Sequence, residues 1–159
     1  MFRVGFGQDS HRFSKDGSRR LILGGIEIPG KKGLEGNSDA DVVIHSICRA
    51  LEQAIGGDSF SVYADKLHNE GINDSRKYLQ ISKANVEKAG YAIGNLGISM
   101  ECKEPRIIPV AEKMKESLGE ILGIKKDQIG INATSGESLT AFGQGEGIQV
   151  FAIVSLLKK

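Results

Sequence analysis

Two residues near the amino terminus, Asp9 and His11, have the types and the spacing of metal ligands. The apolar run at residues 2–6 precedes them and predicts a strand. Alternate side chains of an extended chain point to the same side, so this carboxylate and this imidazole should face the same way. Together they would supply two of the three protein ligands of an open zinc-type site. The alternative is a loop pair that only hydrogen-bonds locally.

The third ligand should be another histidine, and the chain has only three: His11, His45 and His68. The sequence predicts a helix over residues 38–55, with His45 on its polar face, opposite the apolar one. That polar face is either a solvated surface or the face that turns toward the other metal ligands. Residues 65–74 read as a polar loop, so His68 is expected at the surface. His45 is therefore the predicted third ligand.

Several strands and three helices must position these residues. Ser38 and Asp41 fit an S-x-x-D capping pattern, which predicts that the first helix starts at Ser38. Alternating apolar residues predict the clearest strand at residues 95–102. Because strands alternate with helices, we expect an α/β, or α+β, sandwich of helices on one sheet. The other predicted elements are strands at residues 21–23, 26–28, 128–133 and 148–157, and helices at about 74–90 and 109–123.

The segment Thr134-Ser135-Gly136-Glu137 combines hydroxyls, a glycine and a carboxylate. Its hydroxyl and backbone N–H groups suit phosphate oxygens, and its carboxylate suits a hard cation. Taken alone, the segment fits an ordinary surface turn equally well. The glycines of residues 143–147 precede a strand rather than a helix, so they do not favour a dinucleotide site.

The composition limits the functional classes. The 159 residues suffice for a single domain, residues 1–159, or for one subunit of an oligomer. The formal net charge is +1, and no basic stripe is interleaved with aromatics, which argues against nucleic acid or an anionic membrane as a partner. No apolar run approaches the ~20 residues of a membrane-spanning helix, and the amino terminus does not read as a secretion signal. Cys48 and Cys102 read as free thiols, so we expect a cytoplasmic protein.

Several motifs, in their order and spacing, resemble one family over essentially the whole chain: the 2-C-methyl-D-erythritol 2,4-cyclodiphosphate synthases of non-mevalonate isoprenoid biosynthesis. The resemblance rests on GFGQDSHRF at residues 5–13, LGGIEIP at 23–29, SDADVVIH at 38–45, ATSGE at 133–137 and GEGI at 145–148. It implies a mixed sheet with helices packed on one face, a ferredoxin-like arrangement, and a homotrimer with active sites between subunits.

The same resemblance implies two kinds of cation. Asp9, His11 and His45 would hold a divalent transition metal, usually zinc. Glu137 would hold a second cation, Mg²⁺ or Mn²⁺, that bridges the diphosphate of the substrate.

The resemblance also implies catalytic roles for Asn37 and Ser135 and a ribose contact for Asp58. Backbone groups of residues 103–108 would read the cytosine base. The implied substrate contacts are Asp9, His11, Asn37, Ser38, Asp58, Ser59, Phe60, Asp65, Lys103, Pro105, Arg106, Ile107, Ile108, Thr134, Ser135, Gly136, Glu137, Ala141 and Gln144.

The implied substrate is 4-diphosphocytidyl-2-C-methyl-D-erythritol 2-phosphate. Its 2-phosphate would attack the β-phosphorus, releasing CMP and leaving a cyclic diphosphate. The attacking phosphate is already an anion at neutral pH, so no strong general base is required. The main obstacle is repulsion between anions, which bound cations reduce.

The chain departs from the family pattern at two of these positions. Asn37 stands where the family usually has His. It can donate a hydrogen bond but carries no charge, so we expect slower turnover rather than lost binding. Gln144 stands where the family usually has Arg. These replacements favour a second hypothesis, a low-activity paralogue that binds metal and cytidine nucleotide as a trimer. An unrelated metal-dependent phosphohydrolase is a third.

Overall fold

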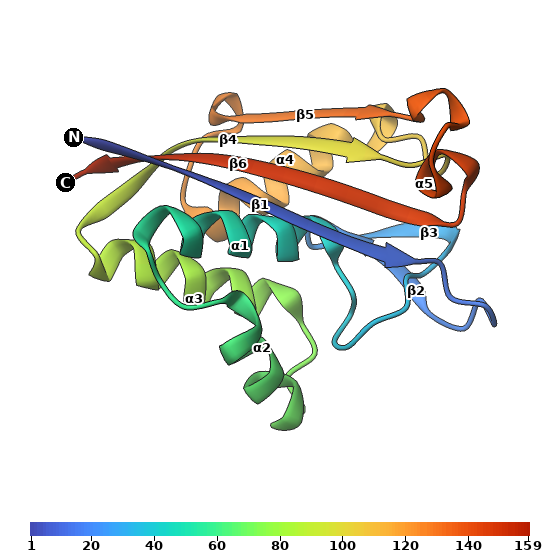
Figure 1. Ribbon diagram of the computed structural model, residues 1–159, viewed down its shortest axis with the longest axis horizontal. Coiled ribbons are helices and arrows are strands. Elements are labelled where there is room, and N and C mark those ends of the chain that lie inside the picture. The colour runs from blue at the N-terminus through green and yellow to red at the C-terminus, as the bar shows by residue number, and fades with distance from the viewer.

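A four-stranded mixed sheet forms one layer of the protein in the computed structural model, which describes residues 1–159 (Figure 1). The strand order is β1-β6-β4-β5. β1 and β4 run antiparallel to β6, which lies between them, and β5 runs parallel to β4 at the edge. The strands are β1 Phe2–Arg12, β4 Tyr91–Glu101, β5 Ile129–Thr134 and β6 Gly147–Lys158.

Helices cover one face of this sheet (Figure 1). α1 packs on β1 and β6, α4 packs on β5, and α3 packs against α1 and α4. None of the helices is long and apolar enough to span a lipid bilayer. The helices are α1 Val42–Ile55, α2 Phe60–Asn69, α3 Ser75–Lys88, α4 Ile108–Leu122 and the short α5 Ala141–Gln144; a separate hairpin joins β2 Arg20–Leu23 to β3 Ile26–Lys32.

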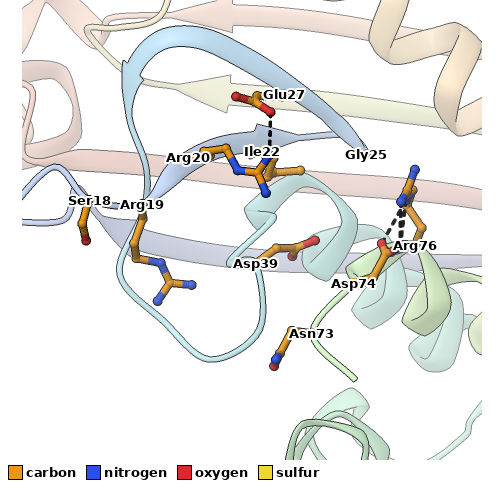
Figure 2. A pocket seen from close by; sticks show the side chains of 10 residues that line it. All are labelled: Ser18, Arg19, Arg20, Ile22, Gly25, Glu27, Asp39, Asn73, Asp74 and Arg76. Carbon is orange, nitrogen blue, oxygen red and sulfur yellow. Dashed lines mark hydrogen bonds and ion pairs between the residues drawn. The ribbon is translucent and has the colours of Figure 1, made fainter. Parts of the chain in front are cut away.

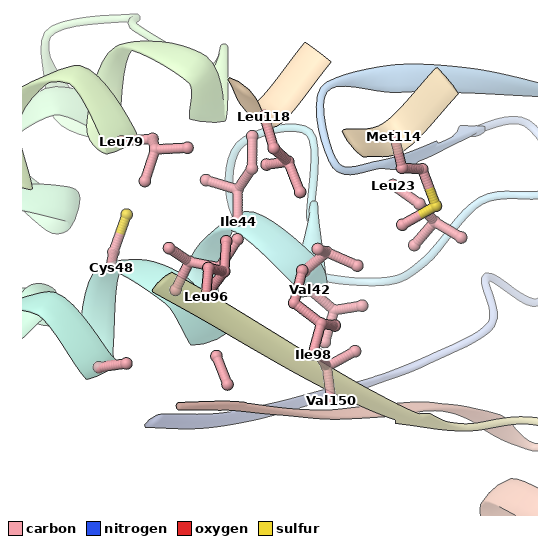
Figure 3. Packing of buried hydrophobic residues seen from close by; sticks show 14 of the residues in the cluster. Leu23, Val42, Ile44, Cys48, Leu79, Leu96, Ile98, Met114, Leu118 and Val150 are labelled. Carbon is pink, nitrogen blue, oxygen red and sulfur yellow. The ribbon is translucent and has the colours of Figure 1, made fainter. Parts of the chain in front are cut away.

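The apolar core lies between the sheet and the helices. In β6, buried residues alternate with more exposed ones, as expected for a strand with one covered face. Figure 3 shows side chains of the sheet, such as Ile98 and Val150, together with Val42 and Ile44 of α1 and Leu118 of α4. Both cysteines of the chain are buried and free, which confirms the prediction of free thiols.

Two glycines of β1 let α1 lie directly on the strand. A Cβ atom at Gly5 would lie 2.0 Å from the backbone oxygen of Ala50, and one at Gly7 would lie 2.1 Å from that of Ser46. Any side chain would clash with the helix backbone at both positions, so only glycine permits this close approach.

The structure corrects the predicted starts and ends of three elements. β1 continues to Arg12, so Asp9 and His11 lie within the strand rather than in a loop after it. The predicted helix start at Ser38 is wrong, because Ser38 and Ala40 have positive φ angles of 58° and 55°, and α1 begins only after Asp41. Part of the predicted 65–74 loop is the end of α2.

The ferredoxin-like arrangement that the resemblance implied is also corrected. Along the main sheet the chain runs β1, helices, β4, α4, β5 and then β6, whereas a ferredoxin-like unit follows the order β-α-β-β-α-β. The reason is that α4 makes a crossover that places β5 parallel to β4. The broader expectation, a mixed sheet with helices on one face, is confirmed.

Asp41 joins the β2–β3 hairpin to the start of α1. Its carboxylate accepts hydrogen bonds from the backbone N–H groups of Gly24 and Gly25, at 2.9 and 2.7 Å. It also accepts from two N–H groups in the first turn of α1, at 3.1 and 3.0 Å. Burial and the charge of Asp39 raise the pKa of Asp41 to about 6, while the N–H groups of Ile44, Gly25 and Gly24 act against that shift. Both oxygens of this buried side chain are thus committed as acceptors.

We predict that Asp41→Asn destabilises the protein. An amide has only one acceptor oxygen, so its NH₂ group would face a backbone N–H and leave buried donors unsatisfied. The expected loss is about 1–3 kcal/mol in the free energy of unfolding, measured by chemical denaturation. Asp127→Asn, at an exposed position, is the control and should unfold like the wild type. Equal stability of the two variants would contradict this role of Asp41.

Candidate functional site

Asp9, His11 and His45 meet at one point between β1 and α1. The Asp9 Oδ2 atom lies 3.0 Å from His11 Nε2 and 3.2 Å from His45 Nδ1. One ligand atom from each residue lies within 4.8 Å of the other two. Ligand atoms around a tetrahedral metal, with bonds of about 2.0–2.1 Å, are roughly 3.3 Å apart, so this spacing suits one divalent ion. The three predicted ligands are therefore brought together.

The register of the sheet explains why Asp9 and His11 face the helices. Asp9 is paired with Val150 of β6, and His11 is paired with Ile148. Residues directly opposite each other in antiparallel strands share a face of the sheet. Val150 and Ile148 are buried in the core under the helices, so Asp9 and His11 point toward the helices as well.

A chain of hydrogen bonds orients His45. Its Nε2 atom lies 2.9 Å from Ser75 Oγ, and Ser75 Oγ donates to Asp39 Oδ1 at 2.5 Å. The Ser75 backbone N–H also donates to Asp39, at 3.0 Å. Since the Ser75 hydroxyl gives its proton to a carboxylate, it accepts from His45 Nε2–H. This arrangement keeps the proton on Nε2 and leaves the Nδ1 lone pair for a metal.

The charge balance of the cluster also suits a cation. Burial raises the pKa of Asp9, but the close approach of His11 and His45 outweighs it and holds that pKa well below its usual range. His11 Nε2 is buried and has no hydrogen-bond partner of suitable geometry, although it lies close to Asp9. A buried imidazole nitrogen of this kind requires an explanation, and metal ligation is one. The donor set of one carboxylate and two imidazoles therefore fits a divalent transition metal.

A pocket of about 140 Å³ adjoins the cluster. Four of the predicted substrate contacts, besides the metal ligands, line it: Asn37, Ser38, Phe60 and Asp65. Asp58 and Ser59 are exposed and immediately precede α2, but they do not line the pocket.

The remaining predicted contacts lie at another corner of the molecule, where β4 and β5 end. Lys103, Pro105 and Gln144 line a separate cavity of about 450 Å³ there. Ile107 is buried in the core with 4% exposure, so its side chain is not available to a ligand. The others at this corner are Arg106, Ile108, Thr134, Ser135, Gly136, Glu137 and Ala141, all at least partly exposed. A single chain therefore does not bring the two groups of predicted contacts together.

Comparisons with known proteins show the family of this chain. The model of the YgbB family matches residues 2–157. The chain belongs to the YgbB family. Two relatives are each named 2-C-methyl-D-erythritol 2,4-cyclodiphosphate synthase: one from Chlamydia muridarum, 41% identical, and one from Chlamydia trachomatis, 42% identical. Each alignment covers 99% of this chain and 89% of the relative.

Solved structures of similar proteins share the fold of this YgbB-family chain. IspF from Plasmodium falciparum, solved as a CDP complex, is 25% identical in sequence and has a TM-score of 0.86. The match covers 99% of this chain and 97% of the IspF chain. The bifunctional IspDF of Campylobacter jejuni is 28% identical, with a TM-score of 0.91, and covers 100% of this chain but 43% of its own.

Sequence reasoning missed several residues of this candidate site. His68, expected at the surface, is partly buried and lines the pocket, with Nδ1 2.7 Å from Asn73 Oδ1. Its place depends on α2, which the sequence did not reveal. The sequence analysis assigned no site role to Ser75, which lies near the start of the helix predicted at about 74–90. It assigned none to Arg49 either, although the i, i+4 spacing of His45 and Arg49 on one helix was a usable signal.

The segment that carries Asn37 and Ser38 is held from its far side. Arg19 donates to the carbonyl of Gly36 at 2.7 Å and to that of Ser38 at 2.5 Å. Arg19 lines a polar cavity of about 650 Å³ that also contains Asp39 (Figure 2). The other two arginines of this cavity form ion pairs within it, so the cavity offers little unpaired charge.

We predict that Ser75→Ala weakens metal binding without unfolding the protein. Loss of the hydroxyl removes the group that orients His45 and fixes its tautomer, and such supporting contacts are typically worth about 10–100-fold in metal affinity. Competition with a chromogenic chelator measures this affinity. Ser61→Ala, which lines the same pocket but does not hydrogen-bond to the ligands, is the matched control. Wild-type affinity in Ser75→Ala would contradict the role assigned to the hydroxyl.

Proposed function

We propose that this protein is a 2-C-methyl-D-erythritol 2,4-cyclodiphosphate synthase. It converts 4-diphosphocytidyl-2-C-methyl-D-erythritol 2-phosphate to the cyclic diphosphate and CMP, as a cyclising phosphorus-oxygen lyase. The observation that carries this proposal is the cluster of Asp9, His11 and His45 in a chain of the YgbB family, whose relatives are named for this product. The CDP complex of a similar structure supports a cytidine nucleotide as the leaving part of the substrate.

Two cations are part of the proposal. Zinc suits the carboxylate and two imidazoles of the cluster, because it accepts three protein ligands and keeps one open position. Glu137 would hold Mg²⁺ or Mn²⁺ together with the substrate diphosphate. When bound, these cations withdraw negative charge from the phosphorus centres.

The residues of the chain bind and orient an already ionised substrate. The 2-phosphate oxygen forms a bond to the β-phosphorus as the bond between that phosphorus and the departing CMP oxygen breaks, so no proton has to move. Asn37 and Ser135 donate hydrogen bonds to phosphate oxygens, and Asp58 accepts from the ribose hydroxyls. Holding both ends of the substrate in a ring-closing pose supplies the proximity that such a displacement needs.

A homotrimer would complete this site. The cluster of Asp9, His11 and His45 lies beside β1, and the predicted cytosine and phosphate contacts lie at the ends of β4 and β5. In the sheet order β1-β6-β4-β5 these strands are about 10 and 14 Å from β1. Both corners could contact one substrate if one corner came from one copy of the chain and the other corner came from a neighbouring copy. The sheet face away from the helices supports this arrangement, because it exposes an apolar group of Phe2, Val4, Phe6, Ile153 and Leu157, each at least half exposed.

The second hypothesis, a trimeric binding protein with little chemistry, is favoured by one specific feature. Asn37 and Gln144 are neutral at positions where the family usually carries His and Arg. The proposal places either protein in the cytoplasm, which the two free buried thiols support.

An assay of the reaction tests the proposal directly. The protein is incubated with the diphosphocytidyl substrate, Zn²⁺ and Mg²⁺, and the products are followed by ³¹P NMR. We expect equal amounts of CMP and cyclic diphosphate. His45→Ala, which removes one metal ligand, should lose bound zinc and activity, whereas His68→Ala should keep its zinc. Free inorganic phosphate would instead indicate a hydrolase, and CDP binding without any product would indicate the binding protein.

The oligomeric state provides a further prediction. Ile153→Glu places a charge in the centre of the exposed apolar sheet face, so it should dissociate the trimer and abolish CMP release. Light scattering coupled to size-exclusion chromatography measures the mass. Val62→Glu, at a residue of α2 with 64% exposure, is the control and should remain trimeric. A wild-type protein that is monomeric at micromolar concentration would refute the shared site.

A further inference from the structure

Arg49 lies beside the cluster of Asp9, His11 and His45 and forms no hydrogen bond with it. It follows His45 by one turn of α1, and its Nη2 atom lies 3.7 Å from Asp9 Oδ1. That distance allows attraction between charges but exceeds the range of a hydrogen bond. The two imidazoles approach the other oxygen of Asp9, Oδ2. Arg49 therefore approaches the side of Asp9 away from the shared ligand point.

The donors of this guanidinium are not used within the protein. Arg49 Nε is buried and has no hydrogen-bond partner, and Asp9 is the only carboxylate in ion-pair range of Arg49. The Arg49 Cζ atom lies 5.3 Å from the centre of the Phe60 ring, which holds the group in place without satisfying its N–H groups. Nε is the one fully buried donor of the group, and an unpartnered buried donor is rare in folded proteins. The Arg49 side chain as a whole is 36% exposed, so its other N–H groups are open to a ligand that accepts from them.

The pocket itself indicates which ligand this is. Arg49 lines it together with Asn37, Ser38 and the three metal ligands, and it is the only permanently charged base in the lining. His68, the other basic group outside the cluster, is turned to Asn73. A metal held by three protein ligands keeps a position for an outside ligand. An anion at that position would lie next to the Arg49 guanidinium, whose fork of N–H donors matches a phosphate.

We propose that Arg49 binds the substrate phosphate that lies next to the metal and supplies a second fixed positive charge there. This inference deepens the proposed function and rests on it. Asn37 contributes no charge to the same pocket, so Arg49 takes over the electrostatic part of phosphate binding. A purely structural Arg49 would instead act through Asp9 and would be needed to keep the metal.

The test compares phosphate binding with metal binding in the zinc-loaded full-length protein. The probe is inorganic pyrophosphate, titrated by calorimetry into wild type, Arg49→Gln and Arg49→Lys. We expect Arg49→Gln to weaken pyrophosphate binding about tenfold or more, which is typical for a lost hydrogen bond to a charged group. Arg49→Lys should recover part of the loss, since it keeps the charge but not the fork. Zinc affinity should be unchanged or higher, because a repelling charge has been removed.

Arg3→Gln is the matched control. Arg3 also lies over an aromatic ring, 4.9 Å from the centre of Tyr91, but it is outside the pocket. This variant removes the same charge and should bind pyrophosphate like the wild type. The inference is overturned if Arg49→Gln binds pyrophosphate like the wild type, or if Arg3→Gln weakens pyrophosphate binding equally. It is also overturned if Arg49→Gln loses zinc or has a lower melting temperature than the wild type.

The assay that follows CMP and cyclic diphosphate by ³¹P NMR separates failure of this inference from failure of the proposed function. If the wild type makes no cyclic product but pyrophosphate binding still depends on Arg49, only the proposed reaction fails. If the wild type does make it, and Arg49→Gln has the same KM for the diphosphocytidyl substrate, only the role of Arg49 fails.

Discussion

The close contact between β1 and α1 is the constraint on which the cluster of Asp9, His11 and His45 depends. Gly5 and Gly7 leave room for the backbone of α1 against the strand, and His45 is thereby brought to Asp9 and His11. Side chains at the two glycines would push the helix outward by more than the tolerance of a metal–ligand bond. The glycines touch no ligand, yet they determine whether three ligands can share one ion.

The two carboxylate oxygens of Asp9 face different partners. One of its oxygens faces two imidazoles, and the other faces the Arg49 guanidinium. His45 is in turn oriented through Ser75 by a second carboxylate, that of the partly buried Asp39. Only one anionic ligand contributes to the cluster, so a bound dication would keep net positive charge. Such a centre would attract phosphate groups, and neutral Asn37 at its rim would direct them without adding to that charge.

The two groups of predicted contacts lie at different corners of one chain. The sheet separates the cluster of Asp9, His11 and His45, beside β1, from the ends of β4 and β5. Strands of a folded sheet cannot move past one another to close that distance. The apolar face on the other side of the sheet is too large to be left in water without a reason. The proposed assembly of identical copies would account for both observations, because a symmetric contact would bury the face and join corners of neighbouring chains.

The sequence by itself determined the family, the candidate metal ligands and most of the regular elements. These follow from local patterns: the i, i+2 spacing of Asp9 and His11 along a strand, and the alternation or helical period of apolar residues. Tertiary structure decided the rest. The start of α1 depends on hydrogen bonds that the backbone N–H groups of Gly24 and Gly25 donate to Asp41. These glycines precede Asp41 by 17 and 16 residues. The place of His68 in the pocket depends on how α2 packs. Such contacts join residues distant in sequence, and no local period records them.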